Sequence, residues 1–487
     1  MNLRSNPRHG ILLLTALAGL VAGCAVNPAT GKRQIILLSE AQEIQMGQEA
    51  DPQIAASIGF YEDEDLQAYV RGLGLPMAAG SERPGLPWSF KVVDDPVVNA
   101  FAVPGGFIYV TRGILATLNS EAELAGVLGH EIGHVTARHS ASQISRQQLQ
   151  QLGLGVGMIL SEGVQKYADL IQSGIGVLNL KYSRGDESEA DRLGFRYMTA
   201  QGYDPHALIG VFETLALVSG GGDGRIPEWQ LTHPYPENRE AAIRDLIRSA
   251  GGDVSGRVEH AGYIQRLDGI VYGENPREGY FEGEAFSHPD LAFRIDFPAG
   301  WKGVNQRTAV GAVSPSEDAL LVLSLEAGAQ TPSAALSAFL GQEGIQGGRL
   351  EETRIGGFPA ARATFSAPAE GGEILGEAAF VAYESNLYRI LGYGSPAGWS
   401  SHGTSIRRAC ETFRKLTDPA ALSVEPARLE IVRLPSAMTF AQFLERYPSD
   451  AGADEVGLIN RVEPQASLEA GRLMKRVVGG PGARRPG

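Results

Sequence analysis

The chain has 487 residues and a formal net charge of −14 at neutral pH, with 42 basic residues against 56 acidic ones. Nucleic-acid-binding proteins need basic patches, so this balance argues against DNA or RNA as a partner. Hydrophobic residues make up 43% of the sequence, which is enough for ordinary buried cores in two or three domains.

The first residues have the pattern of a secretory signal. Arg4 and Arg8 precede an apolar run over residues 11–20, which is too short to span a bilayer. The following Val-Ala-Gly-Cys resembles a bacterial lipobox, in which Cys24 becomes the lipidated first residue. We therefore expect a lipoprotein signal peptide over residues 1–23. The alternative is an ordinary signal peptide with a nearby cleavage site.

Attachment to the membrane is expected to depend on this lipid. The later apolar run over residues 152–160 has only nine residues, which is too short for a transmembrane helix, and we expect it to pack beside the site. Ala25 after the cysteine resembles outer-membrane sorting. Cys410 is the only other cysteine, so acylation of Cys24 would leave no intramolecular disulfide.

Residues 130–134 read H-E-x-x-H, the most informative pattern in the chain. On a helix, His130 and His134 share one face and can bind one metal ion, while Glu131 can act as a general base beside a metal-activated water. Ser120 and Glu123 form a capping-box pattern, which predicts a helix from about Glu121. Three glycines in this helix indicate a surface that another backbone or the metal approaches closely: Gly126, Gly129 and Gly133.

A catalytic zinc site needs a third protein ligand. Glu187 and Asp191 are four residues apart on a predicted helix that stops at Gly202, so one can bind zinc while the other hydrogen-bonds a ligand histidine. His139 lies nine residues after His130, out of phase with the ligands. We interpret it as the end of the zinc helix, where a histidine complements the helix dipole.

Four ordered motifs resemble the CAAX prenyl protease-like gluzincin family of zinc metallopeptidases, in its bacterial periplasmic, β-barrel assembly-enhancing protease type. They are H-E-x-x-H at 130–134, E-x-x-A-D at 187–191, the segment 99–110 that resembles the strand pair before the zinc helix, and T-H-P-x-P-x-x-R at 232–239. Integral members of the family have membrane helices, which this chain lacks, so nothing supports a prenylated substrate.

The resemblance covers roughly residues 35–275 and implies the roles of the site residues. The ligands that it implies for a single zinc ion are His130, His134 and Glu187. It implies Glu131 as the base and Asp191 as the partner of a ligand histidine. In similar periplasmic members the histidine matching His233 sits at the metal as a fourth ligand, which would make the enzyme latent; the alternative is a rigid turn. Arg239 either binds substrate or an oxyanion, or pairs with a helix carboxylate.

The second half of the chain has a different character. Residues 273–284 are rich in Gly, Glu and Pro and predict a linker. Strand patterns and helical runs follow, which predict an α+β domain with an antiparallel sheet covered by helices. The predicted strands are 293–297, 320–325, 361–365, 378–383 and 387–391, and the predicted helices are 333–339 and 405–415. The turn over 297–301 resembles the opening of PsbP-like domains.

We therefore expect an α+β multidomain protein. It has a mainly helical gluzincin-type metallopeptidase domain with a small sheet (24–275), an α+β domain (276–420), a LysM-like segment (421–478) and a disordered tail (479–487).

The function that we expect is zinc endopeptidase activity in the periplasm, on a chain anchored by lipid to the outer membrane. Substrates implied by the resemblance are unfolded or misassembled envelope proteins, bound along an edge strand near residues 108–110. The alternative is a non-proteolytic assembly factor or chaperone, with the LysM-like segment contacting peptidoglycan.

Overall fold

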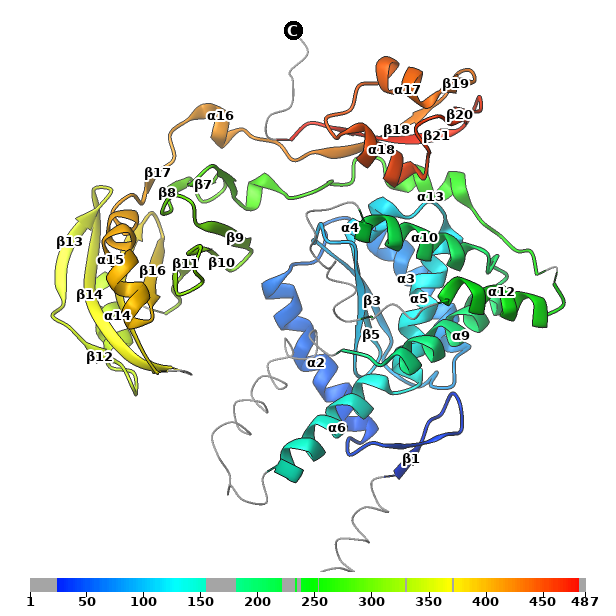
Figure 1. Ribbon diagram of the computed structural model, residues 1–487, viewed down its shortest axis with the longest axis horizontal. Coiled ribbons are helices and arrows are strands. Elements are labelled where there is room, and N and C mark those ends of the chain that lie inside the picture. The colour runs from blue at the N-terminus through cyan, green and yellow to red at the C-terminus, as the bar shows by residue number, and fades with distance from the viewer. Residues whose placement is uncertain are drawn as a thin grey trace, which may run out of the picture. The chain divides into compact units, whose positions relative to one another are not determined.

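The structure is a computed structural model that describes residues 24–154, 181–220, 233, 238–252, 254–328, 331–369 and 372–480. The predicted signal peptide, most of the apolar run over 152–160 and nearly all of the predicted tail lie outside these ranges. The chain divides into two compact units (Figure 1). Unit 1 comprises residues up to Gly273 together with Arg428–Val478, and unit 2 comprises Glu274–Ala427 with the residues from Gly479.

Unit 1 is mainly helical, as the sequence predicts. Before its C-terminal segment, the described helices are α2 (Glu40–Ser57), α3 (Glu64–Ala79), α4 (Arg112–Thr117), α5 (Glu121–Thr136), α6 (His139–Leu154), α9 (Arg184–Ala200), α10 (Ala207–Gly220), α12 (Arg239–Ser249) and α13 (His260–Arg266). A small sheet contains β3 (Ser89–Val93), β4 (Ala100–Val103) and β5 (Phe107–Thr111).

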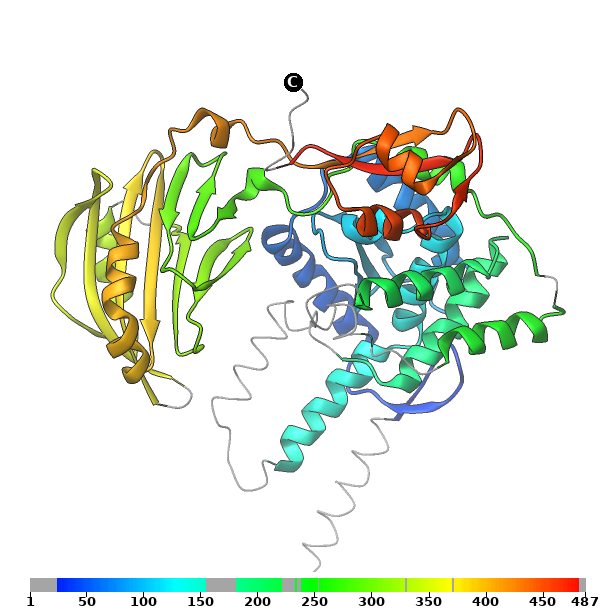
Figure 2. The same cartoon turned by 45° about the horizontal axis from the view of Figure 1, so that its top comes forward.

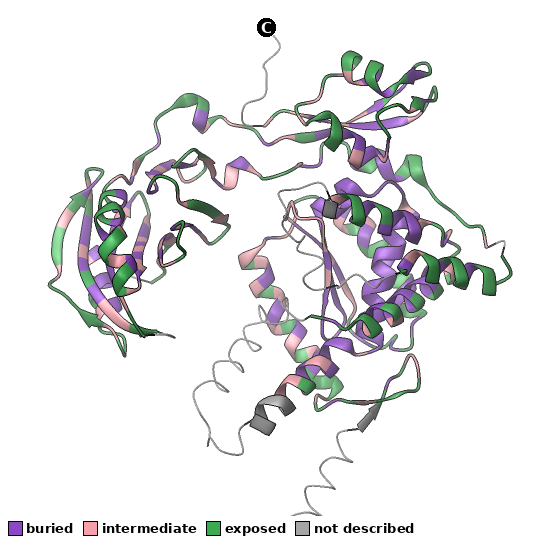
Figure 3. Ribbon diagram, in the orientation of Figure 1, coloured by how far each residue is buried: buried purple, intermediate pink, exposed green. Residues whose placement is uncertain are grey.

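Helix α5 carries the H-E-x-x-H motif and is buried along nearly its whole length (Figure 3). Its predicted start is confirmed, because the Ser120 hydroxyl accepts the backbone N–H of Glu123 at 3.2 Å. The return bond differs from the predicted capping box. The Glu123 carboxylate accepts the N–H of Asn119 at 2.7 Å, one residue earlier than the capping residue.

Helices α5 and α9 approach each other through glycines. A Cβ added at Gly129 would lie 3.0 Å from the carbonyl oxygen of Gly194, and one at Gly133 would lie 3.0 Å from that of Ala190. The close approach that the glycines of α5 predict is therefore confirmed, and the partner is α9.

The predicted strand pair before α5 is confirmed as β4 and β5, which pair antiparallel. Gly105 and Gly106 form the turn between them with φ of 89° and 100°, where other residues are strained. The predicted edge strand is wrong. The strand order is β3-β5-β4, so residues 108–110 lie in the middle of the sheet, because β3 pairs in parallel with the second side of β5.

The N-terminal residues of unit 1 form a hairpin of β1 (Cys24–Val26) and β2 (Arg33–Ile35). Its turn is closed by the N–H of Asn27, which donates to the carbonyl of Lys32 at 2.8 Å. The Gln34 side chain donates to the carbonyl of Ala137 at 2.9 Å, which ties the hairpin to the end of α5.

The C-terminal segment, residues 428–478, packs on unit 1. Its elements are β18 (Arg428–Arg433), β19 (Met438–Thr439), α17 (Phe440–Arg446), α18 (Ala453–Asn460), β20 (Ser467–Leu468) and β21 (Leu473–Val478). Strands β18 and β21 pair antiparallel, and α18 lies against α4 and α10 (Figure 2). The likeness to LysM modules stays a prediction.

A buried lysine fixes this segment in place. The Lys475 ammonium donates to the carbonyls of Ala116, Leu118 and Ile459 at 2.9, 2.6 and 2.9 Å. Two of these carbonyls belong to the end of α4, where backbone acceptors lack helical partners. The single side chain therefore joins β21, α18 and the C-terminus of α4.

Unit 2 is built on an eight-stranded sheet with the order β12-β14-β15-β16-β11-β10-β9, in which β13 also pairs with β14. The strands are β9 (Lys302–Gln306), β10 (Ala309–Val313), β11 (Ala319–Leu325), β12 (Gln346–Gly347), β13 (Glu351–Ile355), β14 (Phe358–Ala369), β15 (Gly372–Tyr383) and β16 (Asn386–Gly394). A smaller sheet has the order β17-β8-β7-β6, with β6 (Tyr280–Glu282), β7 (Ala285–His288), β8 (Phe293–Asp296) and β17 (Arg414–Lys415).

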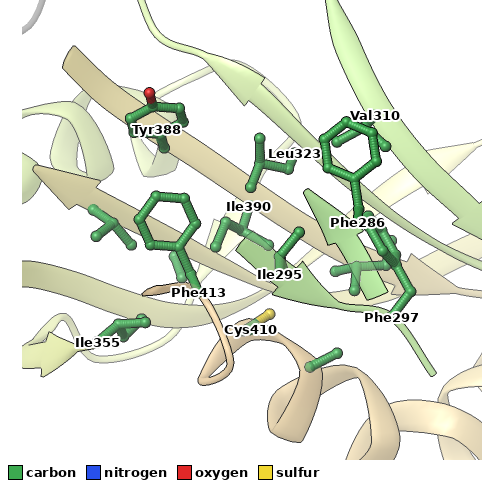
Figure 4. Close-up of a cluster of buried hydrophobic side chains, with 14 of the residues drawn as sticks. Phe286, Ile295, Phe297, Val310, Leu323, Ile355, Tyr388, Ile390, Cys410 and Phe413 are labelled. Carbon is green, nitrogen blue, oxygen red and sulfur yellow. The ribbon is translucent and has the colours of Figure 1, made fainter. Parts of the chain in front are cut away.

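Both faces of the large sheet are covered. Alternate residues of a strand point to opposite faces, so neighbouring residues of β15 join different cores. Ala379 and Val381 of β15 join a core that includes Cys410 of α15 (Pro396–Cys410) and side chains of the smaller sheet (Figure 4). Phe380 joins a second core with α14 (Pro332–Leu340). The predicted α+β architecture with an antiparallel sheet is confirmed.

Two sequence predictions for unit 2 are wrong. The linker predicted over 273–284 contains β6, whose Phe281 packs against the core, so its aromatic residues outweigh the glycines. The helix predicted over 405–415 instead begins at Pro396, where the Ser395 side chain caps it, and ends at Cys410. Among the described residues, no helix is long and apolar enough to cross a membrane.

Candidate metal centre

Two helices supply three of the predicted ligands. His130 and His134 lie one turn apart on α5, with their Nε2 atoms 2.9 Å from each other. Glu187 lies in the first turn of α9, which Ser183 and Asp186 begin with a capping box. Its Oε1 is 3.4 Å from Nε2 of His134, and its Oε2 is 3.5 Å from Nε2 of His130.

His233 completes a group of four. One ligand atom from each of His130, His134, Glu187 and His233 lies within 4.8 Å of the others, and all four residues are buried. Nδ1 of His233 is 3.1 Å from Oε1 of Glu187. The structure thus places His233 beside the predicted ligands, while the rest of the motif from 232 to 237 lies outside the described residues.

The donor set fits a metal ion. Two imidazole nitrogens face each other, and Oε2 of Glu187 is buried with no hydrogen-bond partner. Buried polar atoms in this state are rare and need an explanation, which a cation between these atoms provides. Histidine nitrogen and carboxylate oxygen in a group of three or four are the ligands of zinc.

His130 and His134 differ in their affinity for protons. Burial and the neighbouring His130 hold the pKa of His134 well below its usual value, so its lone pair is available. Burial opposes charge on His130 too, but the carboxylates of Asp191 and Glu187 raise its pKa to about 10. A metal ion must displace this proton, so acid opposes metal binding.

Asp191 lies against His130, where the resemblance implies a partner of a ligand histidine. Its Oδ1 is 2.9 Å from Nδ1 of His130, on the side of the ring that faces away from the cluster. Arg239 grips the same carboxylate with two nitrogens, with Nε 2.8 Å from Oδ2. Although burial by itself raises the pKa of Asp191, Arg239 and His130 lower it below the usual value. Of the two roles predicted for Arg239, the structure contains the ion pair with a helix carboxylate, that of Asp191.

Glu131 has the environment of a proton acceptor. It is buried, its Oε2 has no hydrogen-bond partner, and burial raises its pKa, against the opposing effect of His233 and His130. A carboxylate with a raised pKa accepts protons more readily near neutral pH. Its Oε1 is 3.9 Å from Nε2 of His233.

A pocket opens beside the motif. Its polar wall includes Asn99, His130, Glu131 and His233. Its apolar wall is formed by Ile114, Val127, Leu208, Val211, Phe212 and Leu215. Apart from His233, these residues come from α4, α5, α10 and the segment that enters β4. An apolar side chain that enters this pocket would lie next to the proposed base.

Sequence reasoning missed two neighbours of the ligands. The interpretation of His139 as the end of the zinc helix was wrong: α5 ends at Thr136, Arg138 has φ of 60°, and His139 begins α6. Its Nδ1 lies 2.9 Å from Nδ1 of His134. Tyr182 stacks on the His134 ring at 4.0 Å between centroids. No local sequence pattern predicts the left-handed turn that directs His139 back toward α5.

This fold and site, with an H-E-x-x-H motif on a buried helix, have the arrangement that is typical of zinc metallopeptidases. The model of peptidase family M48 matches residues 64–247. The metalloprotease YcaL of Escherichia coli K12 is 35% identical over 179 residues, which are 35% of this chain and 67% of that protein. The chain belongs to peptidase family M48, whose members depend on zinc.

A second relative is longer than the shared region. The β-barrel assembly-enhancing protease of Yersinia pestis is 32% identical over 240 residues, 47% of this chain and 48% of that protein. The chain thus spans about half the length of the first curated relatives that it matches. A solved cyanobacterial PsbP from Synechocystis covers 27% of this chain and 91% of its own, at 12% identity and a TM-score of 0.23. The PsbP-like assignment of unit 2 stays a prediction.

Proposed function

We propose that this chain is a zinc-dependent endopeptidase of the bacterial cell envelope that degrades misfolded or misassembled periplasmic and outer-membrane proteins. The observation that carries the proposal is the buried cluster of four ligand atoms with Glu131 beside it. The envelope setting is supported by the relatives named β-barrel assembly-enhancing protease and by the lipobox-like residues 21–24.

His130, His134 and Glu187 would hold the zinc ion, with Asp191 fixing the His130 ring. When bound, zinc polarises the scissile carbonyl and makes water a better nucleophile. Glu131 takes the proton of the attacking water and delivers it to the leaving amine. The apolar walls of the neighbouring pocket limit the entry of bulk water around this carboxylate.

The substrate would bind as an added strand on β4, not on β5. In the described part of the sheet β4 pairs only with β5, which leaves its other side for a peptide. Asn99, just before β4, lines the pocket, and its buried Oδ1 has no hydrogen-bond partner. A backbone N–H of an extended peptide would satisfy this oxygen and place the next bond near Glu131.

His233 would keep the resting enzyme latent. Its position in the cluster supports a role as fourth ligand, where it would exclude the attacking water. Activity would then require the imidazole of His233 to leave the metal. Arg239, committed to Asp191 and 3.8 Å from Oε2 of Glu187, would stabilise the carboxylates of the resting and active sites alike.

Two sets of variants test the chemistry. Glu131→Gln should abolish cleavage of an unfolded protein and keep zinc, whereas Glu64→Gln, at a carboxylate that is 83% exposed in α3, should change neither. A double substitution of His130 and His134 by Ala should lose the single zinc ion per chain, measured by metal analysis. Full zinc occupancy in that variant would remove the ligand assignment.

Substrate and location need tests in cells. Proteomics of a Glu131→Gln strain should show trapped envelope proteins that wild-type cells lack. If that strain behaves as the wild type does, the chain acts as a non-proteolytic assembly factor or chaperone. Cys24→Ala should lose membrane fractionation, and sedimentation with outer membranes would reveal another anchor. A peptidoglycan pull-down of the chain tests the proposed cell-wall contact of residues 428–478.

A further inference from the structure

The second nitrogen of each metal-facing histidine has a different partner. Nδ1 of His130 contacts Asp191, the arrangement that the family resemblance implies. Nδ1 of His134 is instead 2.9 Å from Nδ1 of His139, and both rings are buried. The two rings meet edge to face, with centroids 5.0 Å apart and planes at 74°.

A chain of hydrogen bonds continues from His139. Its Nε2 is 3.1 Å from Oε2 of Glu189, and the same oxygen accepts the side-chain N–H of Asn27 at 2.9 Å. Asn27 is only 2% exposed and lies in the turn of the β1–β2 hairpin. Its Oδ1 accepts the N–H groups of Ala29 and Thr30, so the turn holds the amide in this orientation.

The proton positions along this chain are mutually consistent. If His134 offers Nε2 to the metal, its ring proton is on Nδ1 and is donated to His139. Nδ1 of His139 must then be the acceptor, which puts its own proton on Nε2, facing Glu189.

We propose that His139, Glu189 and Asn27 are positioning residues that orient His134 toward zinc, and that the β1–β2 hairpin is thereby a structural part of the metal site. Asn27 reaches the ligand through two side chains across a sequence separation of 162 residues between Asn27 and Glu189. The proposal rests on the proposed zinc site. It extends that site to a segment that begins at Cys24.

Outer partners of metal ligands fix the ring orientation and the tautomer, and their loss weakens metal binding about 10- to 100-fold. His139→Phe fills the space but offers no acceptor to Nδ1 of His134, so zinc affinity should fall by about this factor. Asn27→Ala should give a smaller decrease in the same direction. Glu189→Gln keeps an acceptor for His139 and should retain most of the affinity that Glu189→Ala loses.

Lys32→Ala is the matched control. Lys32 lies in the same hairpin, is 79% exposed, and approaches the other oxygen of Glu189 only at 3.8 Å. Its loss removes a solvated ion pair and leaves the hydrogen-bond chain intact, so zinc affinity should stay within about twofold of the wild type.

The experiment uses the whole chain, titrated with zinc in competition with a fluorescent chelator. The absorption spectrum of the cobalt-substituted protein reports ligand geometry, which a change in fold stability alone would not move. We expect His139→Phe and Asn27→Ala to alter both readouts, and Lys32→Ala to alter neither. Unchanged affinity and spectrum in Asn27→Ala and Glu189→Ala would overturn the proposal even if His139→Phe failed to fold. Failure of the wild type to bind zinc would instead overturn the metal site itself.

Discussion

Arg461, in the C-terminal segment, donates a hydrogen bond to Glu123 in the first turn of α5, the helix with the H-E-x-x-H motif, with 2.9 Å between Nη1 and Oε1. The other terminal guanidinium nitrogen of Arg461, Nη2, donates to the Thr214 hydroxyl on α10. Glu123 uses its other oxygen to cap α5 through the N–H of Asn119. A residue near the C-terminus therefore completes the cap of the helix that carries His130 and His134.

Loss of this contact should destabilise unit 1. Arg461→Ala leaves a buried carboxylate oxygen without its donor, and we expect the free energy of unfolding to fall by about 1 to 3 kcal/mol. Thermal denaturation measures the effect. Arg446→Ala, at an exposed position of α17, is the control and should have little effect. Equal melting temperatures for the two variants would show that Arg461 does not stabilise the fold.

Lys475 should make stability depend on pH. Burial lowers its pKa from 10.5 to about 7, although Glu123 favours the charged form. Between pH 7 and 10 the unfolded chain therefore holds a proton that the folded chain has released, so raising the pH favours folding, by at most about 1.4 kcal/mol per pH unit. Below pH 7 both states hold the proton and the dependence disappears.

The comparison with Lys475→Met isolates this effect from other titrating groups. Denaturant unfolding at pH 6, 8 and 9 should show the wild type gaining stability relative to the variant as the pH rises above 7. A difference that stays constant or shrinks over this range would mean that Lys475 keeps its proton in the folded protein.

Asp191→Ala should weaken zinc binding about 10- to 100-fold, because His130 loses the acceptor of its Nδ1 proton. It should also reduce stability by about 3 to 5 kcal/mol, because the buried Arg239 loses its main ion-pair partner. Asp191→Asn keeps an acceptor and should bind zinc more tightly than Asp191→Ala does. Equal zinc affinities for the two variants, by chelator competition, would contradict this role.

His233→Ala separates three roles in one kinetic assay. A latent enzyme should become more active and should cleave itself. If His233 instead donates a hydrogen bond to the transition state, kcat should fall about 10²- to 10³-fold. If it is only structural, activity should barely change while the melting temperature falls. The proposed latency requires the first result.

The glycine contacts between α5 and α9 leave too little space for even one added methyl group. A Cβ at Gly194 would lie 2.9 Å from the backbone nitrogen of His130, so Gly194→Ala must push the helices apart at a cost of about 1 to 3 kcal/mol. Gly72→Ala is the control of opposite sign. Position 72 is an open site in the middle of α3, where alanine should stabilise by about 0.5 to 1 kcal/mol. Stabilisation by both changes would contradict the close approach.

The sequence was sufficient for the parts of the site that obey local rules. Ser120 marks the start of α5, and the four-residue spacing places His130 and His134 on one face. The partner of His134 was not predictable, because it depends on the left-handed backbone at Arg138 that turns His139 back toward α5. The order of strands was not predictable either. It depends on β3, which pairs with β5 from outside the hairpin, and no residue of β5 reveals that pairing.

If Cys24 carries the proposed lipid, the docked β1–β2 hairpin would limit how far the enzyme can reach from the membrane. Asn27 is hydrogen-bonded to Glu189, and only two residues separate it from Cys24, so the span of three residue steps is at most about 10 Å when fully extended. No long flexible linker would then lie between the acyl chains on Cys24 and the folded domain. The active site would then stay in a thin layer at the bilayer surface. Proteins stalled during insertion into the membrane would encounter it before proteins that diffuse freely through the periplasm.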